Sequence, residues 1–158
     1  RFHALSADGQ VKDASPTSPY RGTTEVFILG RAGSGTPTPE LLATVRERLN
    51  GESIRPLSEE VLVSAGTNIN YVLDVGLVMF TGATAELAIA AAQTTLTTFA
   101  ESHHRLGADV VRSAIDAAAH QPGVKEVIIR SPAVNIICAA HQAPYCTHIA
   151  VSIDGVES

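Results

Sequence analysis

Every second residue from Ile69 to Met79 is apolar, and this alternation constrains the fold more than any other feature of the chain. Because successive side chains of a strand point to opposite faces, the pattern predicts a long strand with one buried face. The other face mixes polar and apolar positions and is expected to be only partly wet: Asn70, Val72, Asp74, Gly76, Val78 and Phe80. Thr81-Gly82 ends the strand.

A helical pattern follows this strand at once. Apolar residues recur at steps of four, three, four and three, which places them on one stripe of a helix: Ala85, Ile89, Ala92, Leu96 and Phe99. The stripe is rich in alanine, so the helix can lie close to a sheet. We therefore expect a strand with a helix packed across it, and we expect other strands to join that sheet.

The composition is that of a globular chain. Hydrophobic residues make up 45% of the 158 residues and charged residues 17%, as in folded proteins. The net charge is −5 and the basic residues form no run, which argues against nucleic acid as a partner. The two cysteines form no disulfide framework. The longest apolar runs are too short to span a membrane, so no membrane partner is expected.

The first part of the chain, residues 1–66, is predicted to have the order β-β-α-β. No signal peptide is visible and the chain starts without Met, at residues that resemble the end of a helix, so we expect a piece of a longer protein. Thr38 caps a helix that begins at Pro39 and ends at Asn50-Gly51. The strands are predicted at Val11–Ser15, Thr23–Leu29 and Glu60–Ala65, with a turn bounded by Pro16 and Pro19 and a loop at Gly30–Pro37.

The second part, residues 67–158, is predicted to have the order β-α-α-β-β. After the long strand and helix come a helix at Arg112–Gln121, a strand at Val124–Arg130, an irregular stretch at Ser131–Pro144 and a strand at His148–Ile153. Both parts are therefore expected to be small α/β sandwiches in the α+β class, with one or two helices packed on a small mixed sheet.

Four residues near the end of the chain have side chains that bind metals: Cys138, His141, Cys146 and His148. Tetrahedral zinc accepts such a mixture of ligands, although the C-x-H pair is closer than in standard zinc sites. A small metal- or ligand-binding module is therefore the alternative function. In the simpler interpretation the cysteines fill apolar space and the histidines are surface or interface groups, and no metal, cofactor or catalytic residue is predicted.

Other candidate motifs favour structural explanations. The loop Gly30–Thr36 has the spacing G-x-x-G-x-G, which is neither a dinucleotide fingerprint nor a Walker loop. His103, His104 and His120 lie near predicted helix ends, where positive charge is favourable. No G-x-S-x-G elbow or other nucleophile–base signature is present, so we do not expect an enzyme.

Short segments in a fixed order carry a family resemblance: Arg1–Asp8, Val11–Ser15, Gly33–Thr36, Glu40–Leu42, Arg55–Leu57, His104–Gly107, Arg112-Ser113, His120–Val124, Ser131–Ala133 and Tyr145–Thr147. Together they cover nearly the whole chain and resemble the C-terminal part of the baseplate J-like proteins of contractile-tailed bacteriophages and related prophage tails. Several matches in the same order are more specific than any one of them.

The resemblance implies a structural protein with no catalytic residues. Members of this family are wedge components of the tail baseplate, joined in a ring around the central hub. The implied partners are other wedge and hub proteins, with self-association left open. The implied location is the baseplate of the virion tail, after assembly in the host cytoplasm. Candidate interfaces are Gly30–Pro37 and Ser131–Pro144, where Val134, Ile136 and Ile137 either await a partner or pack on their own domain.

Overall fold

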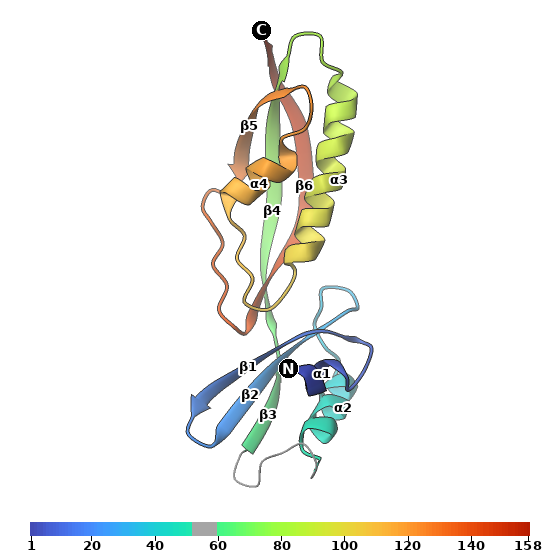
Figure 1. Ribbon diagram of the computed structural model, residues 1–158, viewed down its shortest axis with the longest axis vertical. Coiled ribbons are helices and arrows are strands. Elements are labelled where there is room, and N and C mark those ends of the chain that lie inside the picture. Colours follow the sequence, from blue (N-terminus) through green and yellow to red (C-terminus); the bar gives the residue numbers. More distant parts are fainter. Residues whose placement is uncertain (52–59) are drawn as a thin grey trace. The chain divides into compact units, whose positions relative to one another are not determined.

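The computed structural model describes residues 1–51 and 60–158. Within them the chain forms two compact units, each built on a three-stranded sheet (Figure 1). The first unit comprises Arg1–Ile69, Arg105–Ala108 and Cys138–Ala143, and the second comprises Asn70–His104, Asp109–Ile137 and Pro144–Ser158. The α+β class is thus confirmed, whereas the division into domains 1–66 and 67–158 stays a prediction. Arg55–Leu57, which contributed to the family resemblance, lies outside the described residues.

The first unit has the predicted order of elements. They are α1 (Phe2–Leu5), β1 (Val11–Tyr20), β2 (Thr23–Gly30), α2 (Pro39–Leu49) and β3 (Glu60–Ala65). Strand β2 is central, pairing antiparallel with β1 and parallel with β3, so the sheet is mixed. Both helices contribute to a core of small and branched apolar residues: Ala4, Val11, Ala14, Val26, Ile28, Leu41, Val45, Leu49 and Val63.

The predicted turn between Pro16 and Pro19 is wrong. Both prolines lie inside β1, which continues to Tyr20. Because β1 is at the edge of the sheet, a missing N–H on its outer side breaks no ladder hydrogen bond. The chain turns instead after Tyr20, where Gly22 has a φ of 78° that favours glycine.

Helix α2 begins as predicted. The Thr38 hydroxyl accepts a hydrogen bond from the Leu41 N–H at 3.2 Å, and Pro39 occupies the first turn. The buried face carries Leu41, Val45 and Leu49, and Leu42 is only half-buried.

The second unit also has the predicted order. Its elements are β4 (Thr67–Phe80), α3 (Ala85–His103), α4 (Arg112–Ala119), β5 (Val124–Ser131) and β6 (Gln142–Glu157). Strand β4 lies between β5 and β6 and is antiparallel to β5. The Thr147 hydroxyl of β6 donates to the Tyr71 carbonyl of β4, and further along the chain the Thr81 N–H, just after β4, donates to the Glu157 carbonyl of β6. Later residues of one strand therefore contact later residues of the other. These two strands are therefore parallel, and the second sheet is also mixed.

The alternation in β4 sets the core of the second unit. Tyr71, Leu73, Val75, Leu77 and Met79 are all buried, as predicted. Helices α3 and α4 lie against this side of the sheet (Figure 1) and add Ala88, Ala92, Leu96, Phe99, Ile115 and Ala119 to the core. Val110, before α4, and Val124, at the start of β5, complete it. Strand β6 is longer than the predicted His148–Ile153, because β4 supplies backbone partners beyond the alternating residues.

Two short loops from the second half of the sequence belong to the first unit. The Leu106 N–H donates to the Asp13 carboxylate at 3.0 Å, and the Thr67 N–H donates to the His141 carbonyl at 2.9 Å. A Cβ on Gly66 would lie 2.7 Å from Leu106 Cδ2 and 3.3 Å from the Ile28 carbonyl oxygen, so a larger residue there would displace the Leu106 side chain. Residues 1–66 alone therefore lack part of the compact unit to which they belong.

Candidate functional site

The irregular stretch after β5 is held in place by Arg112, the first residue of α4. Its guanidinium donates to the carbonyls of Pro132 and, at 3.1 Å, Ile129. The backbone N–H of Arg112 also donates to the Asn135 side-chain oxygen at 2.8 Å. Hydrogen bonds to a charged donor are stronger than neutral ones. The segment from Pro132 to Ile137, which we call the pinned loop, is therefore ordered without being a helix or strand.

The pinned loop presents two aliphatic side chains to solvent. Ile136 pairs with Val110 through two backbone hydrogen bonds, of 2.8 and 2.9 Å, and packs against the core. Val134 and Ile137 are 71% and 66% exposed. The alternative of packing on its own unit thus holds for Ile136, whereas Val134 and Ile137 are exposed and their contact with a partner stays a prediction. These two exposed side chains lie three positions apart on one loop, which makes the loop a candidate binding surface.

The side of the second sheet away from the α3–α4 core is a second candidate surface, which we call the open sheet face. Its residues are Val72, Asp74, Gly76, Val78 and Phe80 of β4, Glu126, Ile128 and Arg130 of β5, and Ser152 and Asp154 of β6. Val72, Ile128 and Phe80 are 37%, 38% and 48% exposed. This surface therefore mixes apolar area with charge.

Arg130 links all three strands across the open sheet face. Its guanidinium donates to Asp74 at 2.9 and 3.1 Å, to Asp154 at 2.5 Å and to the Ser152 hydroxyl at 2.6 Å. The hydrogen bonds to Asp74, and then those to Asp154, raise the pKa of Arg130. A Cβ on Gly76 would lie 1.9 Å from the Asp154 carboxylate oxygen. The central strand thus needs glycine there for the ion pair to cross it.

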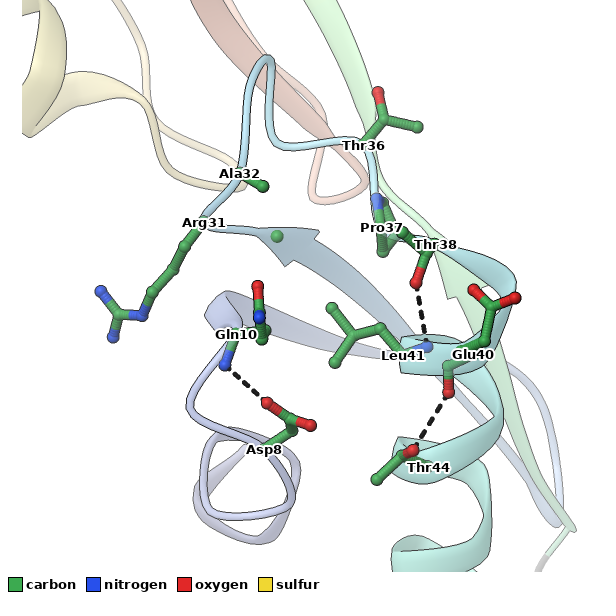
Figure 2. A pocket seen from close by; sticks show the side chains of 11 residues that line it. Asp8, Gln10, Arg31, Ala32, Thr36, Pro37, Thr38, Glu40, Leu41 and Thr44 are labelled. Atoms are coloured by element: carbon green, nitrogen blue, oxygen red, sulfur yellow. Dashed lines mark hydrogen bonds between the residues drawn. The ribbon is translucent and has the colours of Figure 1, made fainter.

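The glycine loop Gly30–Pro37 lines a shallow pocket of about 260 Å³ (Figure 2). The Gly30 N–H is bonded to the Gly35 carbonyl and the Gly35 N–H to the Ala32 carbonyl, at 2.7 and 3.0 Å. Asp8 and Glu40 contribute negative charge to the lining and Arg31 positive charge, and Arg31 Nε donates to the Gly9 carbonyl at 2.8 Å. Two backbone N–H groups of the loop are therefore bonded within the loop itself, and the lining has no excess of positive charge to attract a phosphate.

Cys138 and His141 belong to the first unit, and Cys146 and His148 to the second. Cys138 is buried, and the His141 ring lies 5.5 Å from the Phe27 ring. The half-buried Cys146 thiol donates to the His148 carbonyl at 3.3 Å, and burial raises its pKa. Among residues 1–51 and 60–158, no group of three or more His, Cys, Asp or Glu side chains is arranged to hold a metal ion.

His104 follows the last residue of α3. Its side chain is buried and its ring lies 5.2 Å from the Tyr145 ring, because the chain turns back at the end of α3. His103 instead lies over the Phe99 ring, with centroids 4.0 Å apart, and its Nδ1 is 2.9 Å from the Phe99 carbonyl oxygen. His120 is exposed and follows the last residue of α4.

Several polar residues have hydrogen-bond partners that the sequence did not indicate. Asp13 is 4% exposed and accepts hydrogen bonds from the Arg1 guanidinium, the Ala14 N–H and the Leu106 N–H. Arg112 and Arg130 likewise bond to groups far away in sequence. Such partners follow no local period, so only the folded chain identifies them.

No helix in the described part of the chain has the length and apolar character to cross a membrane.

Comparison with protein families gives matches along most of the chain. The model of the "Baseplate J-like central domain" matches residues 1–65, and that of the "Baseplate J-like protein C-terminal domain" matches residues 71–152. The chain belongs to the baseplate J-like protein family. The resemblance inferred from the short sequence segments is thus confirmed.

Individual relatives agree with this family. The chain is 37% identical over 155 residues to "Baseplate protein J" of Escherichia phage P2, covering 98% of the chain and 51% of the relative. It therefore spans about half the length of the curated relative that it matches. Its fold is similar, with a TM-score of 0.62, to a chain in the cryo-EM structure of the 6-fold symmetrised anti-feeding prophage (AFP) baseplate. That match has 14% identity and covers 92% of this chain and 36% of the other.

Proposed function

We propose that this chain is part of a structural protein of a phage tail baseplate, within the wedge that joins other baseplate proteins around the central hub. The observation that carries the proposal is the match to two domains of one baseplate family along most of the chain. The protein acts in the virion tail, after assembly in the host cytoplasm, by holding its neighbours through non-covalent contacts and not by catalysis.

The pinned loop suits such a role. Val134 and Ile137 are highly exposed, and three hydrogen bonds from Arg112 connect the loop and the end of β5 to α4. Binding by an ordered loop loses less conformational entropy than binding by a disordered one. The loop is therefore our candidate contact with another baseplate subunit.

Co-purification tests the proposal directly. The full-length parent chain is expressed with the other baseplate proteins of the same tail, and the absolute mass of the product is measured by light scattering. We expect a complex of fixed stoichiometry. A parent chain that stays monomeric with every baseplate protein would contradict the assignment.

Two variants test the loop within this experiment. Val134→Glu should weaken the complex by about tenfold or more, because a charge would be buried at the contact. Leu87→Glu, at a 70% exposed position on α3, is the matched control and should leave the complex intact. Stoichiometric metal in the purified protein, with unfolding by a chelator, would instead support the metal-binding alternative through Cys138, His141, Cys146 and His148.

A further inference from the structure

The open sheet face differs from an ordinary solvated sheet surface. A mixed or antiparallel sheet covered on one side normally alternates apolar residues inward with polar residues outward. The outward positions of β4 in this unit hold Asn70, Val72, Asp74, Gly76, Val78 and Phe80, of which Asn70 and Asp74 are polar and Val78 is buried. The central strand therefore carries apolar side chains on both of its faces.

The charged groups on this face are already paired in a fixed arrangement. Arg130 uses Nε and Nη2 for Asp74, Nη1 for Asp154, and Nη2 again for the Ser152 hydroxyl. These bonds join three strands, so the side chains are ordered before a partner binds. Ordered groups lose little rotamer freedom on association.

The charge balance indicates which kind of partner fits. Asp74, Asp154 and Glu126 are three carboxylates, and Arg130 is one guanidinium, so these four groups carry a net charge of −2 near neutral pH. Two copies stacked face to face would bring equal negative charges together, which is unfavourable. Since the Arg130 donors are engaged by its own sheet, it has little capacity left for carboxylates of a second copy.

We propose that the open sheet face binds a different baseplate protein, which lays apolar side chains over Val72, Ile128 and Phe80 and places a Lys or Arg beside Asp154 and Glu126. This inference rests on the proposed baseplate function and names a second contact surface and the chemistry of its partner. The apolar area supplies affinity, and the carboxylates select a basic partner over a second copy.

Binding between the full-length parent chain and each purified baseplate protein of the same tail, measured at low and high salt, tests the inference. Ile128→Glu should weaken one of these pairs by about tenfold or more. Asp154→Asn keeps an acceptor for Arg130 but removes a charge, so it should weaken the same pair and reduce its salt dependence. Leu87→Glu and Glu101→Gln, both exposed on α3, are the matched controls.

The outcomes separate this inference from the proposed function. If the parent chain binds no baseplate protein, the function itself fails. If binding occurs and Val134→Glu weakens it while Ile128→Glu and Asp154→Asn do not, the function stands and the open sheet face is not the contact. A photo-crosslinker at residue 128 should capture a basic segment of another protein, and capture of a second copy of this chain would overturn the assignment.

Discussion

Replacement of Asp13 by alanine is expected to destabilise the first unit by about 3 kcal/mol. The side chain is almost fully buried, and it accepts from the Ala14 N–H at 2.8 Å and the Leu106 N–H at 3.0 Å. A buried donor that loses its acceptor costs about 1–3 kcal/mol, so the two amides together cost at least about 2 kcal/mol. The ion pair with Arg1, whose side chain is 59% exposed, adds less than about 1 kcal/mol because solvent screens it.

Urea unfolding of the 158-residue chain measures this effect. With an m-value of about 2 kcal/mol/M for a chain of this size, the midpoint should fall by about 1.5 M. Amide hydrogen exchange should also become faster at Leu106, which loses its acceptor.

Three further variants make the Asp13 test specific. Asp13→Asn should have an intermediate effect, since its amide turns a donor toward one of the bonded N–H groups. Arg1→Ala should cost less than about 1 kcal/mol. Asp8 is a matched control, because it also accepts a backbone N–H, that of Gln10 at 2.8 Å, but at an exposed position. If Asp13→Ala costs no more than Asp8→Ala, the reasoning from burial is refuted.

Other predictions follow from single contacts. Arg112→Ala should destabilise the chain by about 2 kcal/mol and speed proteolysis within the pinned loop. Arg112→Lys should not restore the stability, because lysine lacks the planar guanidinium that reaches two carbonyls. Equal cleavage rates for the Arg112→Ala variant and the unchanged chain would contradict the proposed role of Arg112. Gly76→Ala should displace the Asp154 carboxylate. The lost ion pairing and the gain from replacing a strand glycine are each about 0.5–1 kcal/mol, so the free energy of unfolding should change by less than about 1 kcal/mol. The salt dependence of that free energy should fall. Burial raises the pKa of Cys146, so at pH 8 a smaller fraction of this residue is thiolate than for an ordinary cysteine. Iodoacetamide should therefore react more slowly with Cys146 in the native protein than in the urea-unfolded protein, and equal rates would argue against burial.

Local patterns in the sequence determined the element order and the buried face of the central strand. The alternation from Ile69 to Met79 predicts both the strand β4 and its inward side, because side-chain direction in a strand depends only on position. Thr38 and Pro39 likewise locate the start of α2, since capping acts within one helical turn. The family resemblance rests on the same kind of information, namely short segments in a fixed order.

The tertiary structure alone decided which polar residues act together. Asp13 meets Leu106 across 93 positions of sequence, and Arg130 meets Asp74 across 56. Strand pairing also explains why β1 continues through two prolines, since only its place at the sheet edge makes them tolerable. Periodicity and capping are properties of neighbouring residues, whereas burial, ion pairing and exposure depend on groups that the chain brings together only when it folds.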